Sequence, residues 1–264
     1  FRNLYTSIRF LNSGTPLKTI ALTSSLPAEG KSLVNVLLAK TISEMGLRVL
    51  QVDADLRKPQ LHLRLGLNNL TGLSNLLTDE NLDWTKVVQK VPDYNNWEVI
   101  SAGTLPPDPT RLLSSIEMNN LVESFKNEGK FDIILFDTPP VLGLADSSLV
   151  AQYCDGLLLL IGLNKVDRSL PKESINRVQE NGGQIVGIIT NSLKKTNFKN
   201  NSGYEIDDIY LHYAEDLVEE INTTEIDESE EDSENSYRLI LVKLKNIYKK
   251  IKDKTDIFLD WIDN

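Results

Sequence analysis

One stretch, Ser-Leu-Pro-Ala-Glu-Gly-Lys-Ser at residues 25–32, constrains the fold of this chain more than any other. The apolar run Thr19–Thr23 before it predicts a strand, and Lys31–Met45 after it predicts a helix. A tight loop between a strand and a helix turns backbone N–H groups toward an anion, and the helix N-terminus adds its positive dipole end. The stretch therefore indicates a phosphate-binding loop (P-loop) in an α/β nucleotide-binding fold.

Short apolar runs alternate with longer amphipathic stretches over most of the chain. The runs are continuously apolar, which suits a parallel sheet covered on both faces. The alternation predicts an α/β fold with a doubly wound, mostly parallel sheet. Strands are predicted at Thr19–Thr23, Arg48–Asp53, Glu98–Ser101, Asp132–Asp137, Gly156–Ile161 and Gln184–Thr190. Helices are predicted at Lys31–Met45, Thr110–Asn127, Ser147–Tyr153 and Ser169–Asn181.

The P-loop residues suggest specific contacts with a nucleotide. Lys31 offers a point charge for the β- and γ-phosphates, and Ser32 offers a hydroxyl ligand for Mg²⁺. Ser25 stands where the usual pattern has its first glycine. The residues expected to contact the nucleotide from this loop are Ser25, Pro27, Glu29, Gly30, Lys31, Ser32 and Leu33.

Acidic residues fall at the ends of two predicted strands. Asp53 and Asp55 follow the second strand, and Asp137 ends the fourth. Ligands of open α/β sheets bind beyond the carboxyl ends of the strands, so these side chains should face the P-loop. A single Asp after a strand is commonly a turn or cap residue. Three in one βα series instead favour a Mg²⁺ and proton-transfer site.

The net charge of −10 comes from one part of the chain. Fourteen of the 38 acidic residues lie within 204–235, where there is no Lys or Arg, and the rest of the chain is slightly basic. No concentrated basic surface is indicated, so we expect no binding to nucleic acid. The lone Cys154, in an apolar context, predicts a buried structural thiol in a reducing cytoplasm and no disulfide framework.

Several segments together resemble the bacterial tyrosine kinases. These are the cytoplasmic domains of capsular and exopolysaccharide chain-length regulators, and they are related to the MinD and ParA ATPases. The resemblance runs from Phe1 to about Ser192. Its segments are the Walker A stretch Thr23–Ser32, the Walker A′ stretch Val52–Pro59 (Val-Asp-Ala-Asp-Leu-Arg-Lys-Pro), the Walker B segment Asp132–Leu142 with Asp-Thr-Pro-Pro, and two further signatures at Gly72–Leu77 and Ser101–Pro109.

The resemblance implies an autokinase that uses ATP and Mg²⁺ to phosphorylate tyrosine. Lys31 and Ser32 would hold the ATP phosphates and Mg²⁺. Together with Ser32, Asp55 and Asp137 would form the coordination shell of Mg²⁺. Asp53 would be linked to the metal and would be the candidate to take the proton from the incoming tyrosine hydroxyl.

The resemblance also implies roles for residues outside these motifs. Asn191 would lie near the adenine, and Arg57 would hold either the subunit interface or the phosphates. The tyrosines expected to accept phosphate are Tyr204, Tyr210 and Tyr213, a sparse cluster.

Self-association follows from the same resemblance, because the family transfers phosphate between subunits. Expected partners are the membrane proteins of polysaccharide polymerisation and export. The location would be the cytoplasmic face of the inner (plasma) membrane, reached through a part preceding Phe1. The family's subunit-contact motif Glu-x-x-Arg-x-x-Arg is matched only at Arg2, and Tyr5 stands at its last Arg.

Two other interpretations compete with the kinase. ATP could instead drive a MinD-like switch, an interaction module of the polysaccharide system without kinase activity. Asn164-Lys-Val-Asp167 copies the guanine-reading element of GTPases. We reject the GTPase because the Walker B end reads Asp-Thr-Pro-Pro, where a GTPase has Asp-x-x-Gly, and because the element follows Asp137 too closely.

The sequence predicts three parts. Residues 1–192 form the P-loop kinase domain, and 193–235 form a polar, then acidic tail with tyrosines that we expect to be flexible. Residues 236–264 predict a basic amphipathic helix with an apolar stripe. Such a helix either binds an acidic membrane surface or a partner helix, or packs on its own domain.

Overall fold

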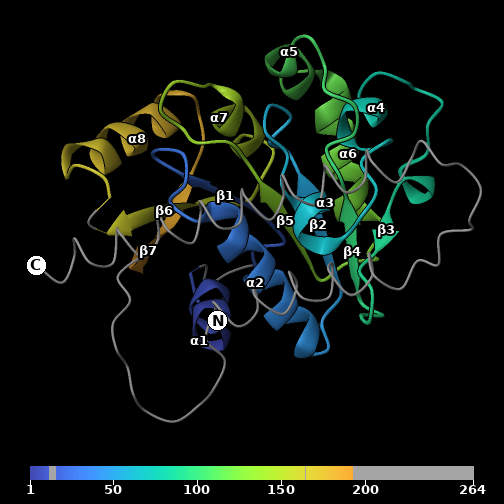
Figure 1. Ribbon diagram of the computed structural model, residues 1–264, viewed down its shortest axis with the longest axis horizontal. Helices are drawn as coiled ribbons and strands as arrows, with labels where there is room; N and C mark the ends of the chain where they lie inside the picture. The colour runs from blue at the N-terminus through green and yellow to red at the C-terminus, as the bar shows by residue number, and fades with distance from the viewer. Residues whose placement is uncertain (12–15, 164, 193–264) are drawn as a thin grey trace, which may run out of the picture. The chain divides into compact units, whose positions relative to one another are not determined.

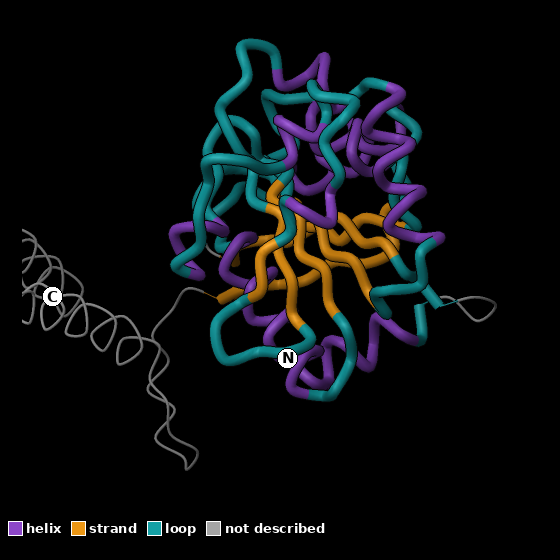
Figure 2. The backbone as a smooth tube through the Cα atoms, turned by 90° about the vertical axis from the view of Figure 1, so that its right-hand side faces the viewer, coloured by secondary structure: helices purple, strands orange, loops and turns teal. Residues whose placement is uncertain are grey.

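A seven-stranded sheet between two layers of helices organises the described residues, which are 1–11, 16–163 and 165–192 of the computed structural model (Figure 2). The strand order is β3-β4-β2-β5-β1-β6-β7 (Figure 1). All neighbours are parallel except β3 and β4. The strands are β1 (Thr19–Ser24), β2 (Val49–Asp53), β3 (Gln89–Lys90), β4 (Trp97–Ile100), β5 (Ile133–Asp137), β6 (Gly156–Leu163) and β7 (Ile185–Ser192).

The helices cover both faces of the sheet. They are α1 (Arg2–Arg9), α2 (Lys31–Glu44), α3 (Leu61–Leu65), α4 (Leu73–Leu76), the 3₁₀ turn η1 (Trp84–Lys86), α5 (Pro109–Leu113), α6 (Ile116–Asn127), α7 (Asp146–Ala151) and α8 (Ser169–Glu180). Within the described ranges, none of them has the length and apolarity that crossing a lipid bilayer requires.

Two hydrophobic cores form because successive strand residues point to opposite faces. In β1, Ile20 and Leu22 pack in a core with α1 and α2, whereas Ala21 packs in a core with α6, α7 and α8. Both faces of the central strands are thus buried, as their continuous apolar runs predicted. The predicted doubly wound α/β fold is confirmed.

The six predicted strands are present, each with bounds within two residues of the prediction. The antiparallel edge strand β3 was missed, because two polar residues carry no strand pattern. Helix α1 was also missed.

The single helix predicted at Thr110–Asn127 was wrong, since the chain forms α5 and then α6. The hydroxyl of Ser115 accepts the N–H of Met118 at 3.3 Å and starts a new helix there. The predictions for residues 193–264, including both tail segments and Tyr204, Tyr210 and Tyr213, lie outside the described residues.

Gly72, at the start of α4, lies against the loop that follows β4. A Cβ at Gly72 would be 2.1 Å from the backbone oxygen of Ser101 and 2.4 Å from the backbone nitrogen of Gly103. These backbone atoms cannot give way, so we expect Gly72→Ala to lower the free energy of unfolding by about 3 kcal/mol. Urea denaturation measures this difference. Thr71→Ala, at the exposed neighbouring position, should change it by less than about 0.5 kcal/mol. Equal stability of the two variants would contradict the close approach.

Candidate nucleotide site

The P-loop connects β1 to α2 at the centre of the sheet (Figure 1). Gly30, the residue before α2, has a left-handed backbone with φ 98°. A Cβ at Gly30 would be only 2.6 Å from Nδ2 of Asn191. The backbone angle therefore favours glycine at this position, and any larger residue would also displace the amide of Asn191.

Glu29 holds the P-loop against β6 through its buried carboxylate. Its Oε1 accepts the N–H of Leu26 at 2.6 Å, and its Oε2 accepts the N–H of Gly162 at 2.6 Å. The side chain has no exposed surface. Both carboxylate oxygens already accept hydrogen bonds from the protein backbone. If Glu29 contacts a nucleotide, we therefore expect the contact to involve its backbone atoms and not its side chain.

Hydrogen bonds from α8 and β7 hold the P-loop in place. The hydroxyl of Ser174, in α8, donates to Oγ of the buried Ser25 at 2.9 Å. Nδ2 of Asn191, near the end of β7, donates to the carbonyl oxygen of Glu29 at 2.9 Å. The structure thus places Asn191 on the P-loop backbone, and its proximity to adenine stays a prediction.

Pro27 lies exposed in the loop, and Leu33 is half-buried in the first turn of α2.

The Asn-Lys-x-Asp element at 164–167 lies beside the P-loop, with Asn164 itself outside the described residues. The ammonium of Lys165 donates to the carbonyl oxygen of Ala28. Oδ1 of Asp167 accepts the N–H and hydroxyl of Ser169 at 2.9 and 2.7 Å. Asp167 thus accepts hydrogen bonds from the first residue of α8, which is a structural role and not the recognition of a guanine base.

Lys31 and the three predicted carboxylates come together beside this loop. Asp53 and Asp137 are register partners at the ends of the adjacent strands β2 and β5, and neither has exposed surface. The ammonium of Lys31 lies 3.1 Å from Oδ2 of Asp55 and 3.9 Å from Oδ2 of Asp137. The structure therefore assembles the four residues expected to carry the chemistry.

The loop after β2 folds around its own carboxylates. Oδ2 of Asp53 accepts the N–H groups of Gln60 at 3.1 Å and Leu61 at 3.0 Å. Oδ1 of Asp55 accepts the N–H of Lys58 at 3.0 Å. These bonds leave Oδ2 of Asp55 directed at Lys31.

Burial and neighbouring charges both shift the pKa values of Lys31 and the carboxylates around it. Burial acts to lower the pKa of Lys31, but Asp137, Asp55 and Asp53 outweigh it and raise the pKa, so the ammonium stays charged. Burial, followed by repulsion from Asp137, raises the pKa of Asp53 to about 8. Burial likewise raises the pKa of Asp137, against the opposing charge of Lys31. A further cation at this site would therefore relieve the repulsion.

The oxygens available here fit Mg²⁺. Neither carboxylate oxygen of Asp137 has a well-formed hydrogen bond from the described residues, although both are buried. The hydroxyl of Ser32 lies 3.2 Å from the ammonium of Lys31 in the same cluster. No group of three acidic, His or Cys side chains in the described ranges is arranged to hold a metal alone. Mg²⁺ suits such a site because it uses one or two carboxylates and completes its shell with water and phosphate oxygens.

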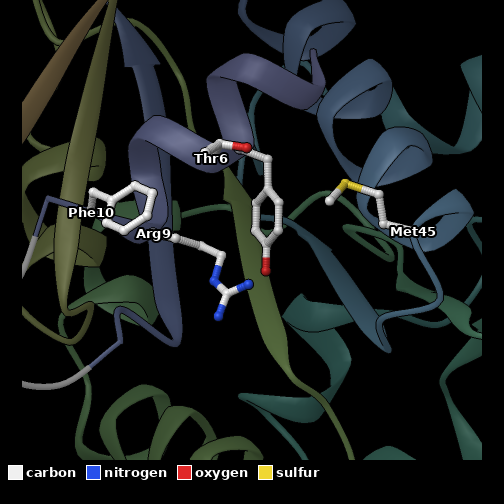
Figure 3. A pocket seen from close by; sticks show the side chains of 5 residues that line it. Thr6, Arg9, Phe10 and Met45 are labelled. Atoms are coloured by element: carbon white, nitrogen blue, oxygen red, sulfur yellow. The ribbon is translucent and has the colours of Figure 1, made fainter.

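A separate hollow lies at the far end of α2. It has a volume of about 230 Å³ and is lined by Tyr5, Thr6, Arg9, Phe10 and Met45 (Figure 3). Met45 follows the last residue of α2, whereas Lys31 begins that helix, so the hollow is not part of the nucleotide site. Tyr5 is only 6% exposed and belongs to the core under α1. Burial raises the pKa of its hydroxyl.

This chain is similar to known tyrosine-protein kinases. The AAA domain pattern matches residues 17–166. The tyrosine-protein kinase YwqD of Bacillus subtilis is 31% identical over 194 residues, which cover 74% of this chain and 80% of YwqD. The tyrosine-protein kinase CpsD of Streptococcus agalactiae is 30% identical over 197 residues, which cover 74% of this chain and 82% of CpsD. The kinase domain of the Escherichia coli tyrosine kinase ETK superposes with a TM-score of 0.69 at 30% identity, over 77% of this chain and 78% of that one.

Proposed function

Because the chain contains an AAA domain and belongs to the bacterial tyrosine-protein kinases, we propose that it transfers the γ-phosphoryl group of Mg·ATP to tyrosine hydroxyls. The observation that carries this proposal is the cluster around Lys31, which lies 3.1 Å from Asp55 and beside the buried Asp53 and Asp137. It joins a phosphate-binding cation to carboxylates that can bind a metal and accept a proton.

Each residue has a distinct part in the proposed reaction. The P-loop N–H groups and Lys31 bind the phosphates, and Lys31 exchanges its carboxylate partners for phosphate oxygens as the nucleotide enters. Ser32, Asp55 and Asp137 would hold Mg²⁺. When bound, Mg²⁺ neutralises the charge of the phosphates.

Asp53 is the proposed base. The tyrosine oxygen forms a bond to the γ-phosphorus, the bond to the β-phosphate oxygen breaks, and the hydroxyl proton passes to the Asp53 carboxylate. Mg²⁺ held by Asp55 and Asp137 would relieve the repulsion that raises the pKa of Asp53, and would so keep its carboxylate ionised and able to accept the proton.

The wider role that we propose is regulation of exopolysaccharide or capsule chain length and export, and it rests on the resemblance of the motifs. We place the acceptors at Tyr204, Tyr210 and Tyr213, on a second copy of the chain. The remaining partners would be membrane proteins of polysaccharide polymerisation and export, at the cytoplasmic face of the plasma membrane.

An ATP-driven switch without kinase activity is the second candidate, and the position of Tyr5 favours it. Where related kinases carry a subunit-contact arginine, Tyr5 is buried in this domain's own core. Oligomerisation that depends on ATP, in the absence of any phosphotyrosine, would support the switch against the kinase.

The test is to incubate the chain with Mg·ATP and to map phosphotyrosine by tandem mass spectrometry. We expect phosphate on Tyr204, Tyr210 or Tyr213, and loss of most of the signal in the variant with all three changed to Phe. That variant keeps its active site, so it should still phosphorylate a Lys31→Met chain that retains the tyrosines. Nucleotide binding without phosphotyrosine in any mixture would contradict the kinase assignment.

A further inference from the structure

Arg57, in the loop after β2, makes a forked ion pair with a buried acid. Its Nε lies 2.7 Å and its Nη2 lies 3.3 Å from the two carboxylate oxygens of Asp146. Nη2 also donates to Oγ1 of Thr110 at 2.9 Å, and the Thr110 hydroxyl donates in turn to Asp146 at 2.9 Å. Asp146 has no exposed surface, whereas the Arg57 side chain is 36% exposed. Nε and Nη2 of Arg57 and both carboxylate oxygens of Asp146 therefore have partners within the domain.

The three residues come from three neighbouring connections of the sheet. Arg57 follows β2, Thr110 lies in α5 after β4, and Asp146 begins α7 after β5. Because β4, β2 and β5 are adjacent in the sheet, their carboxyl ends lie side by side. The fork thus joins the connections that follow β2, β4 and β5, at the edge of the sheet where Asp53 and Asp137 lie.

Arg57 lies within the loop that holds Asp53 and Asp55. The N–H groups of Lys58, Gln60 and Leu61 fix those two carboxylates, so the path of the loop decides where Oδ2 of Asp55 points. A guanidinium anchored to a buried acid is a rigid external support for that path.

We propose that Arg57, Thr110 and Asp146 form a clamp that positions Asp53 and Asp55 for Mg·ATP. This inference rests on the proposed function. Arg57 is a positioning residue in this proposal, because its Nε and Nη2 groups are bound to Asp146 and Thr110. Loss of the clamp lowers the affinity for Mg²⁺ at Asp55 and leaves the conformation of the P-loop unchanged.

The chain supplies a matched control at the other end of β2. Arg48, the residue before β2, forks onto Asp132 at 2.7 and 3.2 Å, far from the carboxyl edge of the sheet. Arg57→Lys and Arg48→Lys both keep the charge and remove the planar fork. The Arg48 pair is more exposed than the Arg57 pair, so urea denaturation measures the stability of each variant separately, and loss of positioning should reduce Mg²⁺ binding only in Arg57→Lys.

The experiment measures ATP binding by calorimetry with Mg²⁺ and with EDTA, and takes the ratio of the two dissociation constants as the Mg²⁺ coupling. For Arg57→Lys we expect the coupling to fall at least about tenfold, as is typical when support for a metal ligand is lost. Binding in EDTA should stay within about twofold of wild type, because Lys31 and the P-loop are unchanged. Arg48→Lys should keep the wild-type coupling. Thr110→Val, which spares the ion pair, should reduce the coupling less than Arg57→Lys.

Wild-type coupling in Arg57→Lys overturns the clamp, and so does an equal loss in Arg48→Lys. If Arg57→Lys fails to fold, Thr110→Val decides, and an unchanged coupling in that variant overturns the clamp. Phosphoryl transfer is not needed for this measurement, so a failed kinase assay beside an intact clamp would count against the proposed function alone. A wild-type protein without Mg²⁺ coupling would contradict both.

Discussion

Changing Lys31 to methionine is expected to lower the rate of tyrosine phosphorylation at least about a thousandfold. The ammonium is 3.1 Å from Asp55 and is the cation that the P-loop offers to the transferring phosphate. Methionine keeps the length and volume of the side chain but removes the charge. The rate is measured from initial phosphotyrosine formation, and ATP affinity by calorimetry should fall with it.

The control for Lys31 is another lysine of α2. Lys40 is half-exposed, and its ammonium lies 3.9 Å from Glu44 on the same helix. Lys40→Met should therefore leave phosphorylation and ATP affinity unchanged. Circular dichroism tests whether both variants are folded, because Lys31→Met leaves the buried Asp55 and Asp137 without their cation. Persistent phosphorylation in a folded Lys31→Met protein would refute the assignment of the P-loop.

The second large effect is expected from Asp53→Asn, which should lower the rate of phosphoryl transfer but not the affinity for ATP. Removal of the proton acceptor is expected to lower the rate of phosphoryl transfer by about 10² to 10⁴. Affinity for Mg·ATP should stay within a few-fold, because Lys31, Asp55 and Asp137 remain. Single-turnover kinetics at saturating ATP separate transfer from binding.

The matched control is Asp132→Asn, at the opposite end of the β5 region, where the carboxylate pairs with Arg48 at 2.7 Å. This change should leave the single-turnover rate at its wild-type value. If Asp53→Asn instead lost ATP binding in step with activity, Asp53 would be a ligand of the metal nucleotide and not the base. A wild-type transfer rate in Asp53→Asn would place the proton acceptor elsewhere.

The sequence predicted the parts of this domain that local patterns determine. The strand at Thr19–Thr23, the P-loop and the helix from Lys31 each follow from their own residues, because apolar period and loop chemistry act over short distances. The proximity of Asp53 to Asp137 could also be predicted, because neighbouring strands of a parallel sheet end at the same edge.

The contacts that hold the site in place could not be predicted in this way. Glu29 binds the N–H of Gly162, and Arg57 binds Asp146, across separations that no local pattern encodes. The Asp after each strand was informative because its residue type is rare in a buried strand. A buried serine such as Ser174 gave no comparable signal. Homologous sequences in which such pairs vary together would be the signal that reveals them.

The position of β1 in the sheet determines when the protein can begin to bind nucleotide during its synthesis. The P-loop leaves the ribosome before β5 and β6, but β1 pairs with both of these strands, Thr19 with Ile134 and Ile20 with Gly156. Pairing between residues so far apart is slow compared with helix formation. The contacts of Glu29 with Gly162 and Asn191 come later still in the chain. A nascent chain therefore carries a complete phosphate-binding motif with no functioning site, and it acquires nucleotide affinity only when the last strand of the sheet has been made.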